Sequence, residues 1–115
     1  MRLVYTAEHL SLAILEYFVH IDSDDPPNDL VLVQAEVPDG VSKVSVPSTR
    51  LPRNWRATPP PPVLAEIGNE FVSGQRSAVL IVPSALAPTE KNWLINPRHP
   101  DFRRIRVKRP EAISL

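Results

Sequence analysis

The chain of 115 residues has no net charge at pH 7, contains no cysteine and is 43% hydrophobic, which allows a single domain with its own core. The lack of cysteine excludes disulfides, thiolate metal sites and cysteine nucleophiles, and the balanced charge argues against a protein whose main task is to bind nucleic acid. No apolar stretch is long enough for a signal peptide or a membrane span, so we expect a soluble, cytoplasmic protein.

The first half of the chain predicts a strand, a long helix and two further strands. We expect a strand over residues 3–5 and a helix over 7–21, with Thr6 as its N-cap because a threonine hydroxyl can accept a bond from a free amide of the first turn. Residues 30–37 are almost continuously apolar, which predicts a central strand. Residues 41–46 alternate apolar and polar side chains, as is typical of a strand near a sheet edge.

The second half is rich in prolines, which predict rigid turns and, over 59–62, a polyproline II connector. A helix is expected over 62–73, with Gly74 as its C-cap. Residues 78–82 are apolar without alternation, as in a strand covered on both faces, and Pro83, which lacks an N–H, is expected to end the ladder. Two shorter strands are expected over 93–95 and 105–108. Helices interspersed among strands predict a mixed α/β or α+β domain.

Glu16 is the first candidate for a functional side chain. Apolar residues lie on both sides of the predicted helix and surround this glutamate, so both helix faces are expected to be buried. A buried carboxylate must be paired or serve a function, and pairing with an arginine or with His20 one turn later is the structural alternative. The apolar residues are Leu10, Ile14, Phe18 and Ile21 on one side and Leu12, Ala13 and Val19 on the other.

Ser84 is the second candidate, because a buried strand that ends abruptly can deliver a polar group to a site. It is not part of a Gly-x-Ser-x-Gly motif and has no base fixed beside it, so hydrogen bonding is favoured over nucleophilic attack. The alternative is an ordinary hydroxyl that caps the turn. Asn92 and Asn96 flank an apolar triplet and are interpreted, together with His99, mainly as loop architecture.

The histidines and the basic residues give weaker signals. The three histidines, at positions 9, 20 and 99, are scattered without a plausible third ligand, so no metal site is expected. Basic residues gather near the C-terminus, where a solvated edge strand is the simpler explanation and a phosphate-facing or partner-facing patch the alternative. They are Arg98, Arg103, Arg104, Arg106, Lys108 and Arg109.

An ordered series of short motifs covers nearly the whole chain. Their order and spacing resemble those of the RES-domain family, the toxin component of a common bacterial toxin-antitoxin system, which is named for an Arg, a Glu and a Ser. The motifs are Val4-Tyr5-Thr6, Ser11-Leu12-Ala13, Leu15-Glu16, His20, Leu51-Pro52, Trp55, Ile67-Gly68, Val82-Pro83-Ser84-Ala85, Asn92, Leu94-Ile95-Asn96-Pro97 and His99-Pro100-Asp101-Phe102.

The resemblance implies a fold, a reaction and a partner. The fold would be a split mixed β-sheet with flanking helices, similar to ADP-ribosyltransferase toxins, with NAD+ bound in a cleft as the substrate and no metal. Glu16 and Ser84 would be the catalytic residues, while Tyr5, stacked on the nicotinamide ring, and Asn92 would bind the cofactor. For Tyr5, a core aromatic with a satisfied hydroxyl is the simpler alternative. The partner would be a helix-turn-helix antitoxin of the Xre type, forming a hetero-oligomer in which this chain touches no nucleic acid itself.

The chemistry of Glu16 suits that reaction. Cleavage of the nicotinamide-ribose bond of NAD+ passes through an oxocarbenium-like state and releases nicotinamide as a neutral ring, so one carboxylate that stabilises positive charge on the ribose can suffice. Water or inorganic phosphate would accept the ribosyl group in an NAD+-degrading toxin. Transfer of ADP-ribose to a protein is the alternative, because the two reactions differ only in the acceptor.

The chain also departs from the family pattern. We expect a single RES domain over residues 1–115 that is shortened at the N-terminus, where the family carries its Arg and a Gly-Arg-Trp type element, and slightly at the C-terminus. Arg2 does not match that element. Because arginine is the usual partner of a pyrophosphate, substrate binding is expected to weaken, and an inactive module that only binds its antitoxin is a further alternative.

Overall fold

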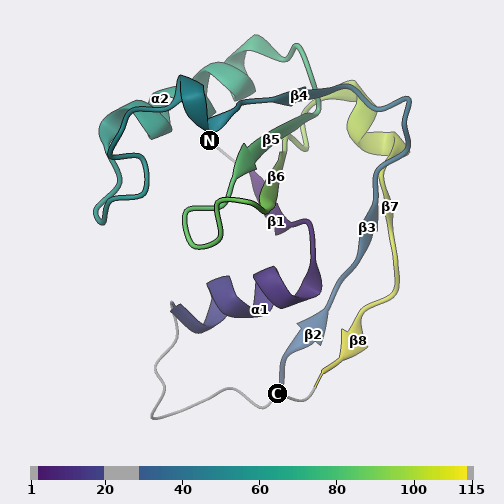
Figure 1. Ribbon diagram of the computed structural model, residues 1–115. Helices are drawn as coiled ribbons and strands as arrows, with labels where there is room; N and C mark the ends of the chain where they lie inside the picture. The colour runs from purple at the N-terminus through teal and green to yellow at the C-terminus, as the bar shows by residue number, and fades with distance from the viewer. Residues whose placement is uncertain (1–2, 20–28, 114–115) are drawn as a thin grey trace.

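The computed structural model describes residues 3–19 and 29–113, which form a mixed α+β structure with two α-helices and eight short strands (Figure 1). The predicted fold class is therefore confirmed. Neither helix of this described part is long and apolar enough to cross a membrane.

A four-stranded mixed sheet with the order β1-β6-β5-β4 forms the centre of the molecule (Figure 1). Strands β5 and β6 form an antiparallel hairpin, β1 pairs antiparallel with β6, and β4 runs parallel to β5 along the other side. The predicted strands near 41–46, 78–82 and 93–95 are confirmed, and the edge position expected for the first of them is correct. The strands are β1 (Val4–Ala7), β4 (Lys43–Ser45), β5 (Val79–Pro83) and β6 (Lys91–Ile95).

The core lies on the central strand and its neighbours. Val79 of β5 is completely buried and packs in one cluster with Val41, Ile95 and Ile105. The apolar run predicted to be covered on both faces is thus the innermost strand. Strand β5 ends at Pro83, as predicted; Pro83 pairs with Lys91, and the amide of Ser84 donates one further bond to the carbonyl of Glu90 at 2.9 Å.

The first helix, α1 (Leu10–Val19), begins three residues later than predicted. Thr6 is not its N-cap but belongs to β1, where its hydroxyl donates to the carbonyl of Trp93 at 2.7 Å. The expectation that both helix faces are buried is also wrong: only Leu12 is fully buried, and Phe18 and Val19 are about half exposed. The predicted end of the helix at Ile21 lies outside the described residues.

The second helix, α2 (Pro62–Gly74), starts at a proline as predicted. Its C-cap is Gln75 rather than Gly74, because Gln75 adopts the left-handed conformation with φ of 49°. A short 3₁₀-helix, η1 (Ser48–Arg50), and a loop precede α2, and Figure 1 shows this loop on the same side of the sheet as the turn between β5 and β6.

A long two-stranded ribbon runs along one side of the molecule (Figure 1). It contains the segment 30–37, whose predicted central position is wrong: this segment forms two short strands that pair with the end of the chain instead of entering the sheet. Val31 and Val33 are consequently at least half exposed. The predicted edge strand over 105–108 is confirmed as part of the ribbon. The ribbon strands are β2 (Val31–Leu32), β3 (Ala35–Glu36), β7 (Arg106–Val107) and β8 (Glu111–Ala112).

A second 3₁₀-helix, η2 (Pro100–Arg104), joins the sheet to the ribbon. His99 caps it, since its Nδ1 accepts a hydrogen bond from the amide of Asp101 at 3.0 Å, which agrees with the architectural role expected for His99. The carboxylate of Asp101 accepts a bond from the amide of Ser42 at 2.9 Å and thereby fixes η2 to the start of β4. This backbone hydrogen bond is the main reason that the pKa of Asp101 is lowered from 3.8.

Candidate active site

Both carboxylate oxygens of Glu16 are held by neutral side-chain donors. The hydroxyl of Ser84 donates to Oε2 at 3.0 Å, and the amide nitrogen of Asn92 donates to Oε1 at 2.8 Å. No lysine or arginine of the described residues pairs with this carboxylate, and His20, the other predicted partner, lies outside the described part of the chain. The described residues therefore hold Glu16 in a fixed direction and place no cation beside it.

The hairpin β5-β6 supplies both donors. Ser84 follows the last residue of β5, and Asn92 lies on β6 opposite Val82, so the two side chains reach α1 from neighbouring strands. Both are fully buried, with 0% exposure. Glu16 is half-buried and projects from α1 toward them. The structure thus brings together the two groups that the sequence singled out as catalytic candidates, although 68 residues separate them.

The hydroxyl of Ser84 is fully used by these contacts. Besides donating to Glu16, its oxygen accepts bonds from the amides of Leu86 at 3.2 Å and Ala87 at 3.3 Å. A serine hydroxyl offers one donor and two acceptor sites, so nothing remains for a further partner. In this arrangement Ser84 orients the glutamate and shapes the turn after β5, which combines the hydrogen-bonding role and the capping alternative considered for it.

Asn92 also links Glu16 to Tyr5. Its side-chain oxygen accepts a bond from the Tyr5 hydroxyl at 2.9 Å, and its nitrogen donates to the carbonyl of Thr6 at 3.2 Å as well as to Glu16. All of its strong hydrogen-bonding groups therefore have partners within the protein. A continuous chain of bonds runs from the phenol through the amide to the carboxylate.

Tyr5 presents its ring to solvent while its hydroxyl is anchored in this network. The residue is 62% exposed, yet desolvation of the hydroxyl end and, secondarily, the negative charge of Glu16 raise the pKa of Tyr5 from 10.0 to about 12. The phenol is thus neutral and a hydrogen-bond donor at physiological pH. The sequence left two interpretations of Tyr5: a ring that stacks on nicotinamide, or a core aromatic with a satisfied hydroxyl. The hydroxyl is hydrogen-bonded, as the second interpretation expects, but the ring is not part of the core.

Tyr5 and Glu16 line an open groove of about 1440 Å³, whereas Ser84 and Asn92 lie behind its surface. The groove exceeds the roughly 300–1,000 Å³ that is typical of small-ligand pockets. Its walls are mostly apolar and come from α1, the ribbon, the loop before α2 and the turn after β5. A half-buried carboxylate and an exposed aromatic ring are thus available to a ligand of considerable length.

Arg56 is a groove residue that the sequence did not reveal. Its Nε donates to the carbonyl of Ala85 at 2.7 Å, so the loop before α2 is attached to the turn that carries Ser84. The neighbouring Trp55 belongs to one of the family-like motifs, but no local pattern distinguishes Arg56 from the chain's other arginines. Only the long-range contact identifies it.

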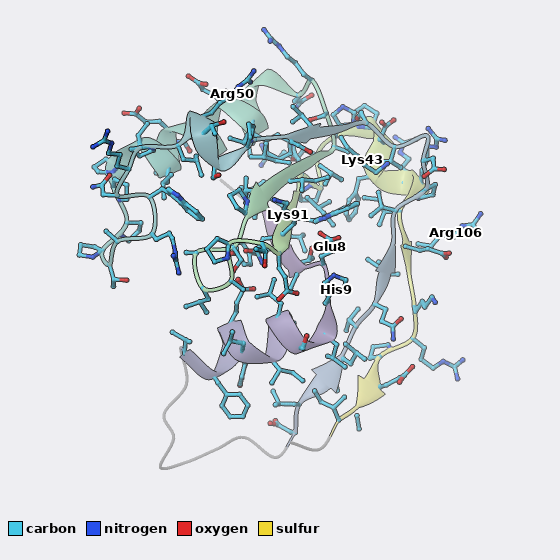
Figure 2. All side chains as sticks on the ribbon, viewed as in Figure 1. Glu8, His9, Lys43, Arg50, Lys91 and Arg106 are labelled. Atoms are coloured by element: carbon cyan, nitrogen blue, oxygen red, sulfur yellow. The ribbon has the colours of Figure 1, made fainter. Side chains whose placement is uncertain are left out.

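The remaining candidates are structural or lie apart. Asn96 is fully buried and its side-chain oxygen accepts from the amide of Arg98, as expected for loop architecture. His9 is exposed beside Glu8 at the turn from β1 into α1 (Figure 2).

Within residues 3–19 and 29–113 no group of three potential ligands is placed to hold a metal ion. Arg106 points outward from the ribbon (Figure 2), in agreement with a solvated edge.

Comparison with known proteins identifies related sequences. The family model for the RES domain matches residues 1–115. The Prs ADP-ribosylating toxin of Sphingobium sp. (strain YBL2) is 41% identical over 112 residues, which are 95% of this chain and 69% of that protein. Proteins named Toxin Res from Yersinia enterocolitica and Photorhabdus laumondii are 40% and 37% identical over 99 residues, 86% of this chain. This chain spans 64% and 63% of the length of those two relatives.

Proposed function

The chain belongs to the RES domain family, and from that premise we propose that it is a bacterial toxin whose groove binds NAD+ and whose Glu16 promotes cleavage of the nicotinamide-ribose bond. The observation that carries this proposal is the carboxylate of Glu16, which Ser84 and Asn92 orient at the surface of a large groove. Relatives with similar sequences are named toxins, one of them an ADP-ribosylating toxin.

The chemistry needs one carboxylate and no general acid. As the bond between ribose C1′ and the pyridinium nitrogen breaks, the electron pair leaves with nicotinamide, which departs as a neutral molecule, and positive charge develops on the ribose. A carboxylate in a groove with apolar walls stabilises that charge strongly, because the local dielectric is low. Glu16 suits this role since its partners are neutral and leave its negative charge uncompensated. An oxygen of water or inorganic phosphate then bonds to C1′, and the proton of the attacking water passes to solvent.

The other predicted site residues support Glu16 and the nicotinamide ring. We assign Ser84 and Asn92 as positioning residues, because both are buried behind the groove surface and their hydrogen-bonding groups are occupied. We propose that Tyr5 stacks its ring on nicotinamide, which is supported by the exposure of the ring and by the bond from its hydroxyl to Asn92. Aromatic stacking of this kind contributes roughly 1 kcal/mol beyond the area that it buries.

The partner belongs to the same proposal. A toxin that consumes NAD+ must be restrained in the cytoplasm that produces it, and an antitoxin that fills the groove would do so. We propose a helix-turn-helix protein of the Xre type for this partner, in a hetero-oligomer in which the antitoxin alone contacts DNA. The support is the name Toxin Res of two relatives and the family membership.

Transfer of ADP-ribose to a protein is the second candidate. It is favoured by the name of the relative from Sphingobium, the Prs ADP-ribosylating toxin. The two reactions share the departure of nicotinamide and differ only in the nucleophile that attacks C1′. Glu16 would have the same role in both.

The test is to incubate the purified chain with NAD+, with and without inorganic phosphate, and to follow nicotinamide release and the mass of the product. Glu16→Gln should lower release by roughly 100-fold or more, since it removes the charge that stabilises the transition state. Glu66→Gln, which changes an exposed carboxylate on α2, is the matched control and should behave as the unaltered chain. Absence of release from the unaltered chain, or equal release from Glu16→Gln, would contradict the proposal.

A further inference from the structure

The groove is poor in positive charge. Among the described residues that line it, Arg56 is the only lysine or arginine, whereas three carboxylates, those of Glu8, Glu16 and Glu36, line it as well. The lysines and arginines labelled in Figure 2, which are Lys43, Arg50, Lys91 and Arg106, do not line the groove. A ligand that carries phosphate groups therefore meets a single guanidinium on the described walls, and otherwise meets apolar, neutral polar or acidic groups and the imidazole of His9.

Arg56 is oriented for an anion. One of its five N–H groups, that of Nε, is used by the carbonyl of Ala85, and this bond fixes the plane of the guanidinium. The side chain is exposed, and no carboxylate of the described residues forms an ion pair with it. Its two terminal nitrogens thus remain available as the planar fork that arginine offers to phosphate oxygens.

Hydrogen bonds through Asn92 and through the turn after β5 connect Tyr5, Glu16 and Arg56 in the order in which the substrate carries its ring, ribose and phosphate. Ser84 bonds to the Glu16 carboxylate, and the next residue, Ala85, bonds to Arg56. The turn after β5 therefore contacts both the carboxylate and the guanidinium, and Asn92 links the carboxylate to Tyr5. Ring, ribose and 5′-phosphate follow one another in the same sequence in the nicotinamide mononucleotide half of NAD+.

We propose that Arg56 binds the phosphate attached to the nicotinamide ribose and so makes the site selective for 5′-phosphorylated substrates over nicotinamide riboside. This inference rests on the proposed function and adds to it the class of substrate: NAD+ and nicotinamide mononucleotide carry that phosphate, whereas the riboside does not. The guanidinium provides charge-assisted hydrogen bonds that only the phosphorylated molecules can accept.

The test compares cleavage of NAD+, nicotinamide mononucleotide and nicotinamide riboside by the full chain and its variants. Arg56→Ala should raise KM for both phosphorylated substrates by roughly 10- to 100-fold and leave the riboside unchanged, because charged hydrogen bonds are lost only with the phosphate. For both phosphorylated substrates, the KM of Arg56→Lys should lie between that of the unaltered chain and that of Arg56→Ala, since lysine keeps the charge but lacks the planar fork. Arg53→Ala removes an exposed arginine of the same loop that does not line the groove. It should leave KM unchanged for all three substrates.

The outcomes separate this inference from the proposed function. If Arg56→Ala weakens all three substrates equally, Arg56 acts only by attaching its loop to Ala85, and the inference is wrong. The inference is also wrong if Arg56→Ala leaves the KM for NAD+ unchanged while Glu16→Gln still abolishes release. Should the unaltered chain cleave none of the three substrates, the proposed function itself fails and the assignment of Arg56 fails with it. Thermal unfolding of each variant controls for loss of the fold.

Discussion

Asn92 and Glu16 are 76 residues apart in the chain, yet the amide nitrogen of one lies 2.8 Å from a carboxylate oxygen of the other. The oxygen of the same side-chain amide accepts a hydrogen bond from the Tyr5 hydroxyl. Asn92 is itself fully buried, and it connects two residues that line the groove. Because Asn92 contacts the Glu16 carboxylate, we expect a negative charge at position 92 to lower the stability of the protein in a way that depends on pH.

We predict that Asn92→Asp destabilises the protein by roughly 3 kcal/mol at pH 7, because it places a second carboxylate against Glu16 in a buried position. Repulsion raises the folded-state pKa of the introduced carboxyl above its unfolded value of about 3.9. Its penalty is therefore smallest at and below that pH and grows as the pH rises toward the folded-state pKa. Urea unfolding at several pH values measures this trend.

The control for that prediction is Asn92→Leu, which removes the amide without adding a charge. Its loss of stability relative to the original chain should be nearly constant over the same pH range. If the loss of stability depends on pH in the same way for both variants, the proximity of residue 92 to Glu16 does not determine how much Asn92→Asp destabilises the protein.

Ser84→Ala should cost about 1–3 kcal/mol of stability, since it leaves two backbone amides and one carboxylate oxygen without a partner. The amides are those of Leu86 and Ala87. Denaturant unfolding measures the loss, and Ser73→Ala, which removes an exposed hydroxyl on α2, should change stability by no more than about 0.5 kcal/mol. Equal stability of the two variants would contradict the network around Ser84.

Titration of Tyr5 tests its link to Glu16. In a Tyr17→Phe background, the phenolate absorbance of Tyr5 should report a pKa of about 12. Glu16→Gln should lower this pKa, because the negative charge is removed, but not down to 10.0, because desolvation is the larger cause. A pKa that is identical in both proteins would show that the charge of Glu16 does not reach the phenol.

The same shift predicts how stability depends on alkaline pH. The folded-state pKa of Tyr5 is raised, so above pH 10.0 the unfolded chain loses its proton first, and stability declines as the pH rises toward about 12. In the background that lacks Tyr17, this part of the decline should be absent after Tyr5→Phe.

Asp101 should contribute stability at neutral pH that is lost in acid. Its folded-state pKa is lowered, mainly by the bond from the amide of Ser42, so the contribution is present above pH 3.8 and disappears as the pH falls through the folded-state value. The difference in unfolding free energy between the unaltered chain and Asp101→Asn should therefore shrink below pH 3.8.

The sequence predicted the elements that depend on local signals. The apolar run before Pro83 marks β5 because no other segment of that length is so uniformly apolar up to a proline, and Pro62 marks the start of α2. Ser84 and Glu16 were identifiable as polar groups attached to apolar elements. The contact between Ser84 and Glu16 could not be predicted, because it depends on how α1 docks on the hairpin.

Other features depend on partners far along the chain. Residues 30–37 read as a central strand, since an apolar run looks the same in a core and in a ribbon, and only pairing with β7 and β8 decides between them. Thr6 is a residue type that often serves as an N-cap, but in the sheet its hydroxyl donates a hydrogen bond to the carbonyl of Trp93. Arg56 owes its position to one bond with Ala85, which no local pattern encodes.

The bonds that hold Glu16 join the first helix to a hairpin made much later in synthesis. A nascent polypeptide that has left the ribosome only as far as α2 contains the glutamate but neither of its donors. The chemistry proposed for this protein therefore cannot begin before the β5-β6 hairpin has formed.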